Sequence, residues 1–223
     1  MSRETQQQNN SNSTKMLVAM VGIGVICALL IVFTFEQTLP VIAKNKAEAL
    51  EKAIFKVVPN ASSFKAFQWS DKKFIEVDKS TEGELLYAGY NSENAFAGLA
   101  IQAAGQGYAD VIRILYGYDV KSQKVVGFYV LETKETPGLG DKIEKEEHFL
   151  ANFEGLDVSL NDNSTIKNEI ETVKQGTKEN AWEIDGITGA TISSRAIGDI
   201  LKESTTYWMP IIQGNKNIFR LEE

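Results

Sequence analysis

A run of 20 residues without a charged side chain, residues 16–35, lies near the start of this 223-residue chain. As a helix at 1.5 Å per residue, this run spans about 30 Å, which is the thickness of the hydrocarbon layer of a bilayer. The apolar core of a signal peptide is shorter, about 7–15 residues. Residues 41–43 (VIA) nevertheless loosely fit a cleavage site. The run therefore predicts a retained transmembrane helix, with a cleavable signal peptide as the alternative.

The charges beside this run predict its orientation. Arg3 and Lys15 precede it and Lys44 and Lys46 follow it, so the two sides carry equal numbers of positive charges. Lys15 lies directly beside the run, whereas residues 36–43 carry no positive charge. This difference favours a cytoplasmic N-terminus and a large domain outside the cytoplasm.

The pattern along the chain predicts four segments. Residues 1–15 are rich in Gln, Asn and Ser and are expected to form a disordered cytoplasmic tail. A transmembrane helix is expected over residues 16–38. A stalk helix with an apolar stripe follows over residues 39–59, with a bend at Pro40 and its end at Pro59. Residues 60–223 are expected to form the extracytoplasmic domain.

The residue pattern between residues 64 and 132 of this domain is typical of strands. The expected strands are residues 85–90, 96–103, 111–116 and 125–130, and residues 119–123 form the turn between the last two. The later part is expected to contain a short charged helix over residues 142–153, a surface loop over residues 156–180 and a last helix that starts at Thr191 and ends before Pro210. Strands with helices at both ends indicate an α+β fold around an antiparallel sheet with flanking helices.

Composition argues against several functions. A net charge of −7 argues against nucleic-acid binding, which needs a basic surface. The single cysteine, Cys27, lies inside the apolar run and cannot form an intrachain disulfide or hold an iron–sulfur cluster. Glu144, Glu146 and Glu147 surround the single histidine, His148. A lone histidine in an acidic helix is typical of a surface residue, so no metal site is predicted.

Residues 185–194 (DGITGATISS) combine small residues, hydroxyl groups and a predicted helix start. Gly189 and Ala190 leave the backbone uncovered, and Thr191 lies where the loop becomes the helix. Its hydroxyl would lie among unpaired backbone N–H groups at the positive end of the helix dipole. This arrangement predicts an anion site, most often a phosphate site. The alternative is an ordinary turn followed by an ordinary helix cap.

A second loop, residues 135–140 (ETPGLG), precedes this segment in the chain. Pro137 and Gly138 are typical of a turn, and Gly140 adds a second flexible point. Such a loop lets the backbone approach a flat ligand while Leu139 offers an apolar contact. The alternative is a plain surface turn.

Residues 188–193 (TGATIS) match the motif of the FMN-binding domain family, and residues 135–140 resemble the ETPGLG loop that these domains carry. In that family, FMN is esterified through its phosphate to the second threonine of the motif by a separate flavin transferase, with FAD as the donor. The resemblance therefore implies covalent FMN on Thr191. It implies the following cofactor-binding candidates: Thr188, Gly189, Ala190, Thr191, Ile192, Ser193, Glu135, Thr136, Leu139 and Gly140.

Expected roles within this set follow from position. The backbone N–H groups of Ile192 and Ser193 would hold the phosphate, and the hydroxyls of Ser193 and Ser194 would either donate to it or cap the helix. The expected contacts of the flavin ring or ribityl chain are Glu135, Thr136 and Leu139.

Two further residues leave alternatives open. Lys142 would either favour the anionic reduced flavin by its charge or simply be solvated. Tyr108 would either pack near the ring or be a half-buried strand residue.

The chain as a whole resembles the G subunits of Rnf-type ferredoxin:NAD oxidoreductases, relatives of the C subunits of the sodium-translocating NADH:quinone reductase. The resemblance covers the apolar run and residues 43–201, and residues 105–110 (GQGYAD) are less glycine-rich than is usual in these domains. It implies an electron-transfer subunit, with the bilayer, the flavin transferase and the other membrane subunits of the complex as partners. The alternatives are a membrane-tethered flavin sensor and a scaffolding ectodomain without flavin.

Overall fold

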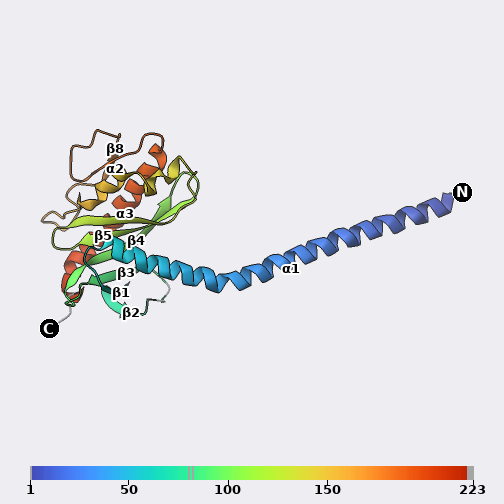
Figure 1. Cartoon of the computed structure of the whole chain (residues 1–223), viewed down its shortest axis with the longest axis horizontal. Coiled ribbons are helices and arrows are strands. Elements are labelled where there is room, and N and C mark those ends of the chain that lie inside the picture. Colours follow the sequence, from blue (N-terminus) through green and yellow to red (C-terminus); the bar gives the residue numbers. More distant parts are fainter. Residues whose placement is uncertain (1, 80, 82, 220–223) are drawn as a thin grey trace. The chain divides into compact units, whose positions relative to one another are not determined.

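The computed structural model describes residues 2–79, 81 and 83–219, with side chains from residue 13 onward (Figure 1). The chain divides into two compact units, the first ending at Glu48 and the second beginning at Ala49. Helix α1, Ser2–Val57, contributes to both.

In the first unit, α1 carries the predicted membrane span. Within the described residues, it is the one helix that is long and apolar enough to cross a bilayer. Pro40 lies inside the helix. Because α1 begins at Ser2, it also includes residues 2–15, for which the sequence predicts a disordered tail. The division into tail, span and stalk stays a prediction.

The second unit is built on an antiparallel sheet of seven strands in the order β2-β1-β3-β4-β5-β6-β7. The α+β fold with an antiparallel sheet and flanking helices is therefore confirmed, and each of the four predicted strands lies within an observed one. The strands are β1 Ser63–Ser70, β2 Lys73–Val77, β3 Leu85–Tyr90, β4 Phe96–Gln106, β5 Val111–Asp119, β6 Lys124–Glu132 and β7 Leu156–Asp157.

A second, two-stranded sheet pairs β8, Glu171–Val173, with β9, Glu183–Asp185, in parallel. The expected surface loop over residues 156–180 is therefore only partly correct, because β7 and β8 lie within it. Strands of two or three residues are too short to show a hydrophobic period.

The helices of the second unit differ from prediction in two places. The single helix expected over residues 142–153 is instead three short pieces: η1 Gly140–Glu144, α2 Glu147–Leu150 and η2 Ala151–Glu154. Their buried Phe149 and Phe153 pack on Phe128 of the sheet, with the Phe128 and Phe153 rings stacked 4.2 Å apart. This packing fixes the segment although its turns are irregular.

Helix α3, Thr191–Asn215, starts where predicted, but its predicted end before Pro210 is wrong. The helix continues through Pro210 and is followed by η3, Lys216–Phe219. Proline costs a helix one hydrogen bond and a steric clash. Trp208, Met209 and Ile212 are buried on either side of Pro210, so tertiary packing outweighs that cost.

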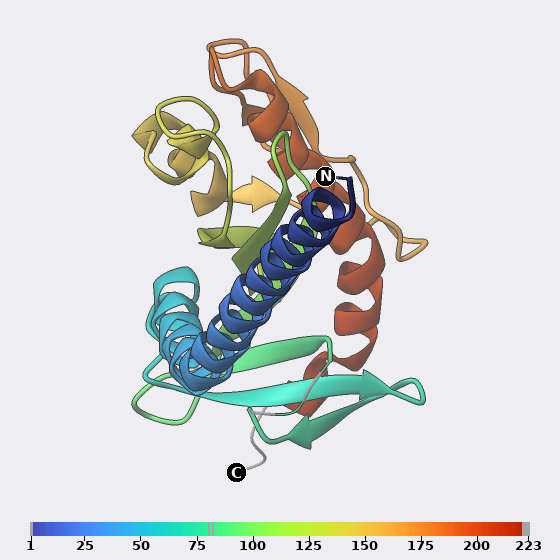
Figure 2. The same cartoon turned by 90° about the vertical axis from the view of Figure 1, so that its right-hand side faces the viewer.

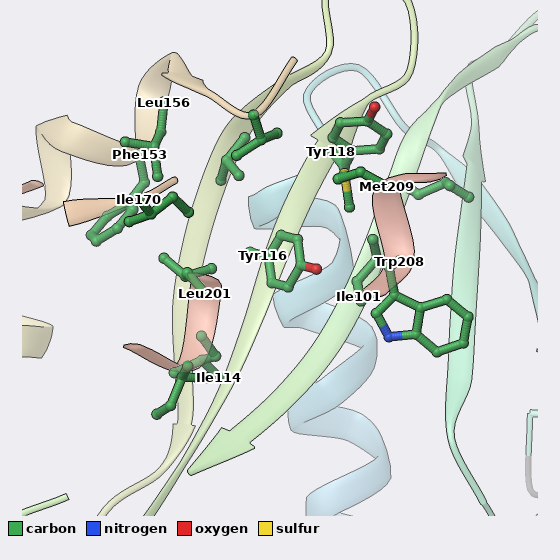
Figure 3. Close-up of a cluster of buried hydrophobic side chains, with 14 of the residues drawn as sticks. Ile101, Ile114, Tyr116, Tyr118, Phe153, Leu156, Ile170, Leu201, Trp208 and Met209 are labelled. Carbon is green, nitrogen blue, oxygen red and sulfur yellow. The ribbon is translucent and has the colours of Figure 1, made fainter. Parts of the chain in front are cut away.

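The sheet is covered on both faces. Alternate residues of β3 point to opposite sides: Leu86 and Ala88 join the larger core cluster, and Leu85 and Tyr87 the smaller one. The larger cluster holds the sheet against α3 and the short helices (Figure 3). The smaller cluster packs the other face of the sheet against the last turns of α1. These turns lie on the side of the sheet away from α3 (Figure 2).

Two facing glycines let α1 approach the sheet. Gly117 on β5 pairs with Gly127 on β6. A Cβ added at Gly117 would overlap the carbonyl oxygen of Val57, and one at Gly127 would lie 2.6 Å from the Cα of Val57. The end of α1 therefore packs against bare backbone on these two strands.

Candidate functional site

A pocket of about 370 Å³ brings the two predicted loops together. Its volume lies within the range of small-molecule sites, about 300–1,000 Å³. Of the residues predicted to bind the cofactor, Thr188 alone does not line it. The lining residues are Tyr108, Glu135, Thr136, Leu139, Gly140, Gly189, Ala190, Thr191, Ile192 and Ser193. That they bind FMN remains a prediction.

The loop that leads to Thr191 is held by hydrogen bonds from distant segments. The N–H of Asp185 donates to Asn152 Oδ1 at 3.0 Å. The N–H of Thr188 donates to Gln175 Oε1 at 2.9 Å. Between them, the N–H of Gly186 donates to Val173 O at 3.0 Å, and the N–H of Ile187 donates to Ser194 Oγ at 3.4 Å. The loop therefore has a fixed path before the helix begins.

Beyond this point, within the described residues, only the Ala190 N–H has an acceptor up to residue 193, the carbonyl of Ile187 at 3.1 Å. In the described part of the chain, no acceptor is found for the N–H groups of Gly189, Thr191, Ile192 and Ser193. Ala190 is the N-cap, and no side chain caps the helix. Gly189 has φ +84°, a conformation that glycine adopts without strain. Four free donors at the start of a 25-residue helix have the arrangement from which the sequence predicts an anion site, and anion binding there stays a prediction.

Thr191 itself is exposed. Within the described residues, its hydroxyl has no hydrogen-bond partner in the protein, so it is accessible to a modifying enzyme. Neighbouring hydroxyls are already engaged. Ser193 Oγ donates to Glu135 Oε2 at 2.5 Å, and Ser194 Oγ donates to the carbonyl of Thr191 at 3.2 Å. Ser193 therefore has only its backbone N–H left for a phosphate.

Glu135 joins three segments at the back of the pocket. Its carboxylate is buried, with 5% of the residue exposed, and accepts from the Ala109 N–H at 2.9 Å as well as from Ser193. A Cβ added at Gly107 would lie 2.6 Å from Glu135 Oε1, and one at Gly140 would lie 2.8 Å from Ser193 Oγ. The missing side chains at both glycines leave room for this carboxylate and for the Ser193 hydroxyl that donates to it. Its hydrogen bonds show that Glu135 holds the pocket together, whereas the sequence predicts only a ligand contact.

The 135–140 loop is braced from within. The N–H of Leu139 donates to Thr136 O at 3.1 Å, and the N–H of Gly138 donates to Asp141 Oδ1 at 2.6 Å. The Lys145 ammonium hydrogen-bonds Asp141 and thereby lowers the pKa of that carboxyl, so the carboxylate that accepts from Gly138 persists to more acidic pH than a free aspartate. The loop is thus fixed, with the side chain of Leu139 exposed.

Three exposed apolar side chains surround the pocket. Tyr108, Leu139 and Ile192 are 66%, 55% and 57% exposed. Tyr108 is neither buried nor in a strand, because it lies in the turn between β4 and β5. A flat apolar ligand would cover such side chains and remove them from water. With the free N–H groups, this rim suits a ligand that carries both a phosphate and an aromatic ring, as FMN does.

Lys142 and His148, the two other titratable residues considered in the sequence, are not part of the pocket lining. Lys142 is half-buried in η1 and does not line the pocket. His148 Nε2 lies 3.4 Å from Gly186 O, and His148 Nδ1 lies 3.7 Å from Glu146 Oε2. Among the described residues, no group of three or more His, Cys, Asp or Glu side chains is placed to hold a metal ion.

Sequence reasoning missed Asn152 and Gln175, which hold the threonine loop. Neither residue belongs to a motif, and each reaches the loop across the fold. No local pattern signals such a contact.

Residues 107–206, which include both loops, match the family model of the FMN-binding domain. The match lies wholly within the second unit of the chain.

The predicted resemblance to the G subunits is also confirmed. The chain is 29% identical over 194 residues to the G subunit of the ion-translocating oxidoreductase complex of Methanosarcina acetivorans, and the match covers 87% of this chain and 93% of that protein. It is 28% identical over 165 residues to the protein of the same name from Escherichia coli K12, covering 73% and 75%.

Two solved structures share the fold. Shewanella oneidensis NqrC superposes with a TM-score of 0.59 at 15% identity, over 76% of this chain and 98% of that one. The C subunit of the Na(+)-translocating NADH-quinone reductase from Parabacteroides distasonis gives a TM-score of 0.58 at 19% identity, over 75% and 94%.

Proposed function

We propose that this chain is a membrane-anchored electron-transfer flavoprotein that carries FMN esterified through its phosphate to Thr191. It would work within an Rnf-type complex that couples ferredoxin:NAD electron transfer to ion translocation. The observation that carries the proposal is the exposed hydroxyl of Thr191, which has no partner in the described part of the chain and lies among four backbone donors that also lack one there. The FMN-binding domain and the relatives named as G subunits of ion-translocating oxidoreductase complexes support it.

Bound FMN supplies the redox chemistry, because its ring accepts and releases electrons. The free N–H groups of Gly189, Ile192 and Ser193 would hold the phosphate by charge-assisted hydrogen bonds. Tyr108 and Leu139 would pack against the ring and exclude water from part of it. Glu135 holds its own loop to the start of α3 through Ser193 and to the turn between β4 and β5 through Ala109.

Thr191 Oγ1 would be joined to FMN by the flavin transferase. In that step Oγ1 bonds to the phosphorus of the FMN half of FAD. The bond between the two phosphates of FAD breaks, AMP leaves, and the hydroxyl proton passes to a base. Among the described residues that line the pocket, the one carboxylate is that of Glu135, which is held in place by Ala109 and Ser193. The base would therefore be supplied by the transferase.

A relay between other subunits fits the rest of the chain. The single cysteine cannot ligate an iron–sulfur cluster, so this chain would receive its electrons from a partner. The apolar run has no ionisable side chain apart from the thiol of Cys27, so it offers no path for an ion. Ion movement would take place in other membrane subunits.

Purification from membranes of the native host tests this function. We expect a flavin spectrum together with multi-span membrane subunits and an iron–sulfur protein in the same preparation. Flavin without redox partners would favour a tethered sensor, and absence of flavin would favour a scaffold.

We expect the N-terminal anchor to be retained and the FMN-binding domain to lie outside the cytoplasm. The reason is the length of the uncharged run, together with Lys15 directly before it. Intact mass of the membrane-extracted chain tests retention, and a mature chain that begins at Lys44 would contradict it. Protease added to cells with a permeable outer surface tests orientation, since a protected domain would place it in the cytoplasm.

Leu139→Asp is expected to lower the flavin potential. A carboxylate beside the ring disfavours the anionic reduced form by about 1 kcal/mol, the interaction of two close charges in water. Flavin attachment to Thr191 should continue, because Leu139 is exposed and supports no core contact. The measurement is a redox titration of the variant against the parent.

Ile75→Asp is the matched control, because Ile75 is a 50% exposed apolar residue on β2, away from the pocket lining. Its potential should equal that of the parent. If Leu139→Asp also matches the parent in potential and flavin fluorescence, the loop faces solvent or a partner instead.

A further inference from the structure

Asn152 of η2 is a buried amide, with 5% of the residue exposed. Its Nδ2 donates to the carbonyls of Phe149 and Asp185 at 2.9 and 3.1 Å, with a longer contact of 3.4 Å to His148 O. Its Oδ1 accepts from the Asp185 N–H and from Lys178 Nζ, each at 3.0 Å. Both ends of the amide are therefore fully used, as a buried polar group requires.

This side chain binds both backbone polar groups of Asp185, the residue where the threonine loop begins. The same loop rests on the segment that follows β8. Asp185 Oδ1 accepts from the Gly176 N–H at 2.7 Å, and Gln175 Oε1 accepts from the Thr188 N–H. Asn152 also accepts from Lys178, which lies in the segment that follows β8. Asn152 therefore holds both this segment and the threonine loop to η2.

Asn152 does not line the pocket. Its substitution therefore removes no contact that a ligand in the pocket would make. It would instead free the start of a loop that ends at Thr191 with four backbone donors in fixed positions. Group transfer to a hydroxyl is sensitive to such positioning, since a displacement of about 1 Å can cost a hundredfold in rate.

We infer that Asn152 is a positioning residue for the attachment of FMN: by clamping Asp185 it presents the Thr191 hydroxyl to the flavin transferase. The inference rests on the proposed function. The chemistry is the step given above, in which Oγ1 replaces AMP on the FMN phosphorus and the transferase takes the proton.

The test is flavinylation of the full chain in detergent by purified flavin transferase with FAD and Mg²⁺. Attached flavin is followed by in-gel fluorescence, and the initial rate is measured at several chain concentrations. For Asn152→Ala we expect kcat to fall about tenfold or more with KM within about twofold of the parent, because positioning affects the reactive geometry. Hydrogen exchange should quicken in peptides that cover residues 185–191.

Three comparison variants separate positioning from a general loss of stability. Asn152→Asp keeps the acceptor for Asp185 and Lys178 but loses the donor to the Asp185 carbonyl, so its kcat should lie between those of the parent and Asn152→Ala. Asn161→Ala removes an amide that braces another loop, and Leu99→Ala opens a cavity in the sheet core. If circular dichroism shows that these two variants are folded, their kcat should equal that of the parent.

A folded Asn152→Ala that matches the parent in kcat would overturn the inference. If Asn152→Ala fails to fold, Asn152→Asp becomes the test. A kcat of Asn152→Asp equal to that of the parent would then overturn the inference. A fall in rate that is equally large in folded Leu99→Ala would also overturn it. A parent chain that takes no flavin would instead overturn the proposed function.

Discussion

Thr191→Val is expected to leave the chain without covalently bound flavin. Valine has nearly the shape of threonine but lacks the oxygen that would bond to the phosphate, and the exposed position at the start of α3 tolerates the exchange. The attachment should fall to background because the neighbouring hydroxyls are badly placed: Ser193 and Ser194 are buried and hydrogen-bonded, and Thr188 does not line the pocket. The variant and the parent are each co-expressed with the transferase, denatured and run on a gel. Fluorescence of the band under ultraviolet light then measures the attached flavin.

Thr188→Val is the matched control. Thr188 is also exposed and lies in the same loop, and it is held through its backbone N–H, which valine retains. This variant should fluoresce like the parent. If Thr191→Val is fluorescent and Thr188→Val is not, the phosphoester bond to FMN lies on Thr188.

Gly117→Ala is expected to destabilise the second unit of the chain by about 3 kcal/mol, at the upper end of the cost of overpacking a core. The added methyl group would overlap the carbonyl oxygen of Val57, which is backbone and cannot rotate away. Either β5 or the end of α1 must shift, and both belong to the packed core. Denaturant unfolding of the full chain in detergent, followed by tryptophan fluorescence, measures the change.

Gly214→Ala provides a control of opposite sign. Gly214 lies in α3 with nothing within 4 Å of an added Cβ, and alanine favours a helix over glycine by about 1 kcal/mol. This variant should therefore be as stable as the parent or more stable. Equal unfolding midpoints for the two variants would mean that α1 does not press on the sheet at Gly117.

The elements that could be predicted are long apolar segments bounded by turn residues. Strands β3 to β6 are each at least six residues long, which is enough for a strand-forming run to show and for turns to mark its ends. The continuation of α3 past Pro210 could not be predicted, because it depends on the burial of Trp208 and Met209 in the assembled core.

The same distinction holds for the site. Thr191 and its neighbours form a contiguous motif, so their place at a helix start can be predicted from the sequence. The role of Glu135 could not, because its partners Ala109 and Ser193 are 26 and 58 residues away along the chain. Asn152 reaches Asp185 across 33 residues, and only the folded chain brings the two together.

The most direct test of covalent attachment is peptide mass mapping of the chain purified from its native membranes. We expect the peptide that contains residues 185–194 to be heavier by one FMN less one water, and fragmentation to place the added mass on Thr191. An unmodified peptide in a chain that still binds flavin, or the added mass on any other residue, would contradict the proposal that Thr191 carries the FMN.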